Sequence, residues 1–149
     1  MKKTILFLAT FIFVSLSAIA EENRVIDFKS DDFVITLKKS VGNTPAQVVK
    51  LEFLLVHSLP NQTIYFNESG SKALAYDEEG NSYDVRVTNG SGYWGNQYYM
   101  PTDQPRKISM QVESILSKVE FLSSLVFTIR TSNGRVEVTM RDIPVTWKY

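Results

Sequence analysis

Four aromatic side chains in one short segment are the residues of this 149-residue chain best suited to recognition chemistry. Tyr93, Trp94, Tyr98 and Tyr99 lie within seven residues of one another, and residues 89–101 are otherwise rich in glycine and side-chain amides. Aromatic rings with polar tips, next to amides, are typical of surfaces that stack against sugars or anchor partner proteins. The segment therefore predicts contact with a protein partner or a glycan, made by Tyr93, Trp94, Asn96, Gln97, Tyr98 and Tyr99.

A simpler interpretation of the same segment is structural. Trp94 and one or two of the tyrosines would fold over the end of the domain and close its core. The glycines favour contact over a lid, because a segment that only covers the core does not need so much backbone freedom. The sequence leaves both interpretations open.

Groups for acid–base or nucleophilic catalysis are scarce in this chain. His57 is the only histidine, and the adjacent Ser58 would point to the opposite face of a strand. Gly90-Ser91-Gly92 lacks the spacing of a nucleophile elbow, and the absence of cysteine excludes thiol chemistry. With 16 acidic residues, the possible carboxylate pairs for glycosidic cleavage are too many to be informative. We therefore expect that the protein is not an enzyme. A small hydrolase or a hydrolase inhibitor is a further alternative.

Metal ligands are similarly few. One histidine and no cysteine make a zinc site improbable. Asp77, Glu79, Asn81 and Asp84 form an oxygen-rich turn of the kind that calcium prefers, although their spacing matches no calcium loop. Acidic turns of this kind are usually just solvated, so these four residues are only a weak calcium candidate and no cofactor is expected.

The N-terminus has the three-part layout of a secretory signal. Met1-Lys2-Lys3 precedes an apolar run from Ile5 to Val14, and small residues, Ala18 and Ala20, stand at the positions that a signal peptidase recognises. The apolar run is shorter than the ~20 residues of a transmembrane helix. We therefore expect residues 1–20 to be a cleaved signal peptide and the protein to be exported by a bacterium, to the periplasm or the extracellular space. No cysteine follows the run, which argues against a lipid anchor.

Charge excludes further classes of partner. Cleavage of the signal peptide would remove two lysines from the 16 basic side chains and none of the 16 acidic ones, which leaves a formal charge of −2. A chain without a basic field is unsuited to binding nucleic acid, and no run of Lys or Arg is long enough for a polybasic membrane patch. Residues 21–149 suit a single domain. Without disulfides, its stability must come from buried apolar surface or from a partner.

The elements that position these residues are predicted to be strands. In the segment 33–38, Phe33, Ile35 and Leu37 share one face, which is the period of a half-buried strand. The same alternation occurs in the segments 63–66, 83–88, 106–112, 125–130 and 135–140 and in the first half of 47–57, where Val49, Leu51 and Phe53 point inward. The second half of 47–57 is apolar on both faces and predicts a strand covered on each side. Pro144 interrupts the segment 143–147, which is predicted to lie on a sheet edge or to continue after a bulge. Turn residues separate these segments, and Ser132-Asn133-Gly134 predicts a tight hairpin.

One stretch departs from the period of two. Apolar residues recur at spacings of three and four between Val112 and Leu122, which predicts a short helical insert near 113–122. An irregular connection whose apolar side chains plug one end of the domain is the alternative. Together the elements predict an all-β fold, an antiparallel immunoglobulin-like β-sandwich of about 7–9 strands, with a small barrel as the alternative.

Two stretches carry a resemblance to a known family. The apolar strand from Val48 to Val56, the polar turn after it, and the stretch from Ala75 to Tyr83 with its Asp77, Gly80 and Tyr83 resemble a bacterial family of exported immunoglobulin-like domains. Those domains commonly carry an aspartate–glycine–tyrosine hairpin before a strand. The resemblance implies an immunoglobulin-like fold and a binding role rather than a catalytic one.

The sequence thus predicts an exported, non-enzymatic binding or interaction module whose contact surface is the aromatic segment. A carbohydrate-binding domain that uses the same segment is the alternative.

Overall fold

Alternating burial runs through most of the chain, as the period-two pattern predicts. The computed structural model describes residues 25–68 and 70–149, and within this part every regular element is a strand. The eleven strands are β1 (Ile26–Lys29), β2 (Phe33–Asn43), β3 (Val48–His57), β4 (Gln62–Phe66), β5 (Ala73–Tyr76), β6 (Ser82–Val87), β7 (Gln97–Met100), β8 (Arg106–Val112), β9 (Phe121–Thr131), β10 (Gly134–Pro144) and β11 (Thr146–Lys148). The signal peptide predicted at residues 1–20 lies outside the described residues, among which no helix has the length and apolarity needed to span a membrane.

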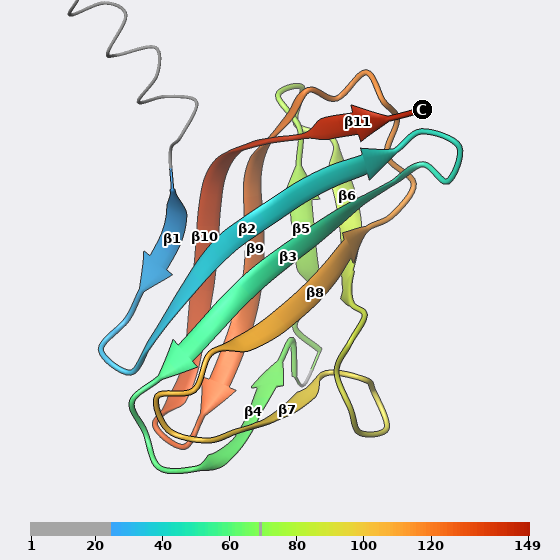
Figure 1. Ribbon diagram of the computed structural model, residues 1–149. Coiled ribbons are helices and arrows are strands. Elements are labelled where there is room, and N and C mark those ends of the chain that lie inside the picture. Colours follow the sequence, from blue (N-terminus) through green and yellow to red (C-terminus); the bar gives the residue numbers. More distant parts are fainter. Residues whose placement is uncertain (1–24, 69) are drawn as a thin grey trace, which may run out of the picture.

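The strands pair into one folded sheet with the order β1-β2-β3-β8-β6-β5-β9-β4-β7. In addition, β10 pairs with β9, and β11 pairs with β2 in the only parallel arrangement between the described strands. Strand β6 connects the two layers of the folded sheet, because its first part pairs with β5 and its end pairs with β8. As a result β2, β3 and β8 cross in front of β5, β9 and β10 (Figure 1).

The core lies between these two layers. Leu51, Phe53 and Leu55 of β3 point into it because they alternate with outward residues. The ring of Phe127 on β9 contacts the rings of both Phe53 and Phe66, with centroids 5.9 and 6.0 Å apart. Burying a large apolar side chain contributes about 1.5–3 kcal/mol, so this cluster supplies stability to a domain without disulfides.

The predicted all-β, antiparallel class is confirmed, with the parallel β11 as an exception, whereas the predicted number of strands is too low. The strands missed are short. β1 and β5 have four residues each, and β7, also of four residues, lies inside the segment interpreted as a loop. The predicted segment 143–147 is divided between the end of β10 and the start of β11. Four or fewer residues give too little alternation for a pattern to be recognised. The hairpin predicted at Ser132-Asn133-Gly134 is present and joins β9 to β10.

The helical insert predicted near 113–122 is wrong. The chain between β8 and β9 is irregular, with Ser114 at a φ of 53° and a single turn-type hydrogen bond from Val119 N to Leu116 O, 3.1 Å. Ile115 N donates instead to Gln47 O, 2.9 Å away on the β2–β3 connection. Ile115 and Val119 are buried, so the apolar residues plug one end of the domain. Spacings of three and four fit such a plug as well as a helix face.

Candidate binding groove and aromatic hairpin

The aromatic segment folds into a tight hairpin that joins β6 to β7. Ser91 and Gln97 exchange two backbone hydrogen bonds of 2.8 and 3.0 Å, and Gly95 N donates to Gly92 O at 3.1 Å. Tyr93 and Trp94 occupy the two corner positions of the turn that this last bond closes. We call residues 89–97 the aromatic hairpin.

Glycines make this hairpin possible by permitting close approach. Gly92 and Gly95 have φ values of 85° and 66°, which residues with a Cβ rarely adopt. A Cβ on Gly90 would lie 2.2 Å from Gly95 O, and one on Gly92 would lie 2.5 Å from the Cδ of Gln97. These glycines therefore allow backbone conformations and close approaches that residues with a Cβ rarely permit.

The four aromatic residues divide between the core and the surface. Tyr98 is fully buried, packs edge-on against Phe66 with centroids 5.3 Å apart, and donates its hydroxyl to Asn89 Oδ1. Burial raises the pKa of Tyr98 well above its usual value. Tyr93 and Trp94 are 89% and 80% exposed, and Tyr99 is 59% exposed. The lid interpretation thus describes Tyr98 but not the other three.

Tyr93 and Trp94 form a pair at the tip of the hairpin. Their ring centroids are 4.9 Å apart with an interplanar angle of 86°. The T-shaped arrangement is one that aromatic rings favour, and it holds the two side chains together although both face solvent.

A groove of about 720 Å³ lies next to this pair. Because β10 occupies one edge of β9 along its whole length, β4 and β5 must share the other edge, one after the other. The chain leaves the sheet between β4 and β5, and again between β6 and β7 at the aromatic hairpin. These two departures interrupt the sheet, and the groove occupies the interruption.

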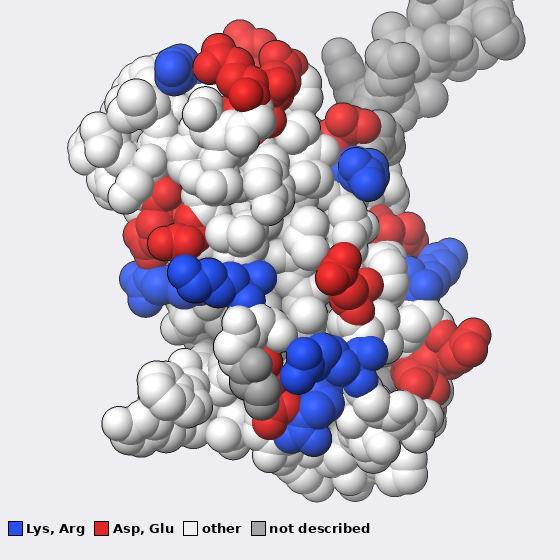
Figure 2. Space-filling view, turned by 180° about the vertical axis from the view of Figure 1, so that it is seen from behind, with Lys and Arg blue, Asp and Glu red and all other residues white. Residues whose placement is uncertain are grey.

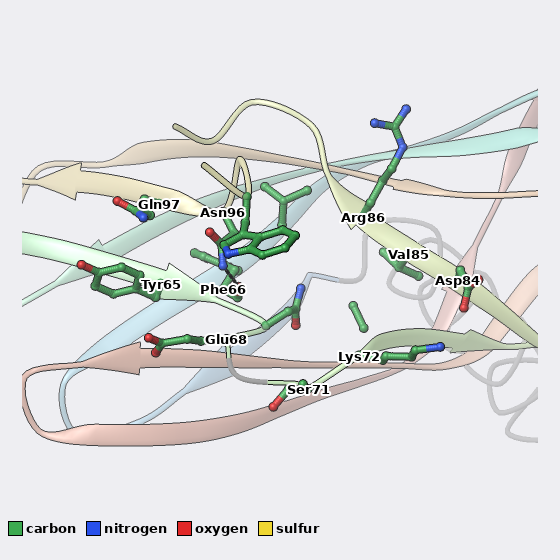
Figure 3. A pocket seen from close by; sticks show the side chains of 15 residues that line it. Tyr65, Phe66, Glu68, Ser71, Lys72, Asp84, Val85, Arg86, Asn96 and Gln97 are labelled. Atoms are coloured by element: carbon green, nitrogen blue, oxygen red, sulfur yellow. Dashed lines mark hydrogen bonds between the residues drawn. The ribbon is translucent and has the colours of Figure 1, made fainter. Parts of the chain in front are cut away.

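Buried residues form the bottom of the groove and polar residues its sides. Phe66, Ala73 and Val85 line it and are themselves almost inaccessible. Figure 3 shows Glu68, Ser71 and Lys72 on one side and Asn96 and Gln97 on the other, while the guanidinium of Arg86 points away. The indole of Trp94 also lines the groove.

Ion pairs engage two of the charged residues of the groove. Glu68 accepts two hydrogen bonds from Arg130, one of them 2.9 Å long from Arg130 Nη2 to Glu68 Oε1. The guanidinium of Arg130 also lies over the ring of Tyr65, with its Cζ 4.4 Å from the ring centroid. Arg86 pairs with Glu113, and this hydrogen bond lowers the pKa of Glu113 below its usual value. Neither charge is therefore fully free to attract an ion.

Two asparagine amides at the groove are each fixed at one end. Asn96 Nδ2 donates to Phe66 O at 2.7 Å, which leaves its Oδ1 as a free acceptor among the described residues. Asn67 Oδ1 accepts from Thr128 N at 3.2 Å, which leaves its Nδ2 as a free donor within the same part of the chain. The groove therefore carries one anchored acceptor and one anchored donor.

The sequence predicts only part of this site. Trp94, Asn96 and Gln97 line the groove and come from the predicted contact segment. Tyr65 to Glu68, Gly70 to Ala73 and Asp84 to Val87 complete it, and local pattern identifies those stretches only as strands and turns. Their proximity depends on how β4, β5 and β6 pair around β9, which is a property of the whole fold.

His57 has a structural environment. It is buried, its Nε2 donates to Met100 O at 2.8 Å, and its Nδ1 accepts from Leu59 N at 3.1 Å. Ser58 instead faces solvent and bonds to Asp32 O. The two side chains do not meet, so they form no nucleophile–base pair.

Of the four residues considered for calcium, Asp77 holds together the hairpin between β5 and β6 through hydrogen bonds. Its Oδ1 accepts from Glu79 N and Asn81 N, both at 2.9 Å, and its Oδ2 accepts from Asn81 Nδ2 at 3.0 Å and from the Tyr83 hydroxyl at 2.7 Å. These donors, Tyr83 first, lower the pKa of Asp77 to about 2. Burial and the same hydrogen bond raise the pKa of Tyr83 to about 12.

Asp77 thus serves as a hydrogen-bond acceptor for its own hairpin. Its carboxylate oxygens already accept four hydrogen bonds, so a cation would have to displace protein donors. Over residues 25–68 and 70–149, no group of three or more His, Cys, Asp or Glu side chains is arranged to hold a metal ion.

No protein-family model matches this chain, and a search of curated proteins finds no match. The functional argument therefore depends on the groove and the aromatic hairpin themselves.

Proposed function

We propose that this protein is an exported, non-enzymatic binding module that contacts its partner through the aromatic hairpin and the adjoining groove. The observation that carries the proposal is the Tyr93–Trp94 pair, almost fully exposed yet held by a glycine-defined turn beside the groove. Covering an indole would contribute roughly 3 kcal/mol, and the isolated domain does not gain it. Rigid exposed aromatics are the usual anchors of binding surfaces because little entropy is lost when they are covered.

The proposal extends to export and to fold family. The layout of residues 1–20 supports a signal peptide, and mass spectrometry of the protein from a periplasmic fraction should give a chain that begins at Glu21. The two layers of strands and the Asp77–Tyr83 hydrogen bond support an immunoglobulin-like sandwich related to the exported family that the sequence resembles.

A non-enzymatic role is supported by the positions of the candidate catalytic groups. Both nitrogens of His57 are hydrogen-bonded in the interior, away from Ser58. The residues that line the groove include the acidic Glu68 and Asp84 but no histidine that could act with them. A generic esterase and glycosidase screen of the mature domain should therefore give flat progress curves.

The binding role is tested with arrays of glycans and peptides and with lipid vesicles. We expect the mature domain to bind at least one class, Trp94→Ala to lose that binding, and Tyr149→Ala to keep it. Tyr149 is a suitable control because it is 92% exposed and does not line the groove. Equal binding by the wild type and Trp94→Ala, or no binding to any class, would contradict the proposal.

A further inference from the structure

We infer that the ligand of the groove is a neutral oligosaccharide, with one sugar ring stacked on Trp94 and its hydroxyl groups bound by Asn67 and Asn96. This inference rests on the proposed function and names the ligand class of the same site. It is argued from the stacking surface of Trp94, two anchored amides and the mixed charge of the lining residues.

The stacking surface is the indole of Trp94. It lines the groove, is 80% exposed and stands at a corner of the hairpin turn. The edge-to-face contact with Tyr93 favours one orientation of the ring before a ligand arrives. The face of an aromatic ring carries partial negative charge, which attracts the C–H groups on the apolar side of a pyranose. A ring that already favours one orientation loses less entropy on binding.

The two anchored amides suit hydroxyl groups. A sugar hydroxyl both donates and accepts hydrogen bonds. Asn96 offers Oδ1 as an acceptor because its Nδ2 is held by Phe66 O, and Asn67 offers Nδ2 as a donor because its Oδ1 is held by Thr128 N. A ligand with many hydroxyls can satisfy both amides at once, whereas an aliphatic side chain of a peptide would leave them without partners, which costs free energy.

The charges around the groove favour a neutral ligand. Residues 88–102 carry no charged side chain, and Figure 2 shows the uncharged lobe that projects at the lower left of this face. Glu68 and Arg86 are ion-paired with Arg130 and Glu113, while Lys72 and Asp84 add one charge of each sign. Arg135 adds a cation at the rim, where its Nη1 donates to Ser71 Oγ at 3.3 Å. The residues that line the groove are thus mixed in charge and offer an anionic ligand no excess of cations.

The same features disfavour a lipid surface. Anionic membranes are recognised by clusters of Lys and Arg, which the lobe lacks. A flat bilayer would also cover the Tyr93–Trp94 tip without filling a groove of about 720 Å³, a size within the range of about 300–1,000 Å³ of small-ligand sites.

The test uses tryptophan fluorescence, since the chain has two tryptophans. Trp147→Phe leaves Trp94 as the only reporter. Cellohexaose, xylohexaose, mannohexaose, maltohexaose and chitohexaose are titrated into this variant, and acrylamide quenching is measured at saturation. We expect at least one of them to shift the Trp94 emission and to reduce its quenching about twofold, because a stacked sugar excludes the quencher. Calorimetry on the chain with both tryptophans should give the same affinity.

A variant of Asn67 separates recognition from stability. Asn67→Asp keeps the oxygen that accepts from Thr128 N but replaces the free donor by an acceptor. We expect it to weaken sugar binding about tenfold, the effect of losing one hydrogen bond to the ligand, while thermal unfolding stays unchanged. Tyr149→Ala should bind as the wild type does.

Three outcomes overturn the inference. If no neutral oligosaccharide perturbs Trp94 while a peptide or vesicles of phosphatidylethanolamine and phosphatidylglycerol bind in a Trp94-dependent manner, the ligand class is wrong and the binding module stands. Preference for polygalacturonate over every neutral sugar contradicts the neutral ligand. If no probe of any class binds through Trp94, both proposals fail.

Discussion

Replacing Gly42 by alanine should destabilise the domain through a clash with Trp147. Gly42 on β2 pairs directly with Trp147 on β11, and a Cβ at this position would lie 2.3 Å from Cε3 and 2.4 Å from Cδ2 of the indole. The indole is held in place because its Nε1 donates to Val119 O at 2.7 Å. Forcing an extra carbon into such a contact costs about 1–3 kcal/mol, so we expect Gly42→Ala to lower the free energy of unfolding by that amount.

A double-mutant cycle isolates this contact. Trp147→Ala should cost about 3 kcal/mol by itself, since it removes a partly buried ring and one hydrogen bond. Once the ring is absent, alanine at position 42 has room, and replacing glycine in a strand should stabilise by roughly 0.5 kcal/mol. The two substitutions should therefore be coupled by about 1.5–3.5 kcal/mol. Urea denaturation of the four proteins measures the coupling, and additive effects would refute the packing of β11 on β2.

Three further predictions concern the hairpins. The free energy of unfolding should fall as the pH drops from about 4 to about 2, because the pKa of Asp77 is about 2 in the folded protein against 3.8 for a free side chain. Tyr83→Phe should reduce this pH dependence and lower the free energy of unfolding by about 1–2 kcal/mol. If acid titrations of the wild type and Tyr83→Phe, followed by circular dichroism, superimpose, this prediction is contradicted. Trp94→Ala should change stability by less than about 0.5 kcal/mol in thermal melts, as an exposed side chain does, and a larger loss would identify it as a lid. Asn133 and Asn89 are both exposed and both precede glycine. The Asn133 amide is bonded only to the side chain of Asp32, at 3.2 Å, whereas the Asn89 amide is held by Lys107 O, Ser109 N and the Tyr98 hydroxyl. Asn133 should therefore deamidate faster, and equal rates in peptide mapping after incubation at alkaline pH would contradict this.

Local pattern is sufficient for the long strands of this fold. The alternation along the first half of β3, with Val49, Leu51 and Phe53 inward, is observed as predicted, because a strand with one buried face must alternate. The hairpin at Asn133-Gly134 follows from turn chemistry in the same way. Both features are decided by residues close together in the sequence.

Features that depend on distant contacts could not be predicted. Ile115 occupies a plug rather than a helix because its backbone bonds to Gln47, a residue far away in the sequence. The burial of Tyr98 beside the exposed Tyr99 follows from the pairing of β7 with β4, which aims alternate side chains to opposite sides. The groove arises from two interruptions of the sheet, and no single segment contains it.

The indole N–H resonance of Trp94 tests the contact surface most directly. A ¹⁵N-labelled sample should show two indole signals, one from Trp94 and one from Trp147, which Trp147→Phe assigns. On addition of a ligand found on the arrays, the Trp94 signal should move while the Trp147 signal stays in place, because Trp147 is bonded to Val119 O away from the groove. A bound ligand that leaves the Trp94 signal unmoved would contradict the assignment of the aromatic hairpin as the binding surface.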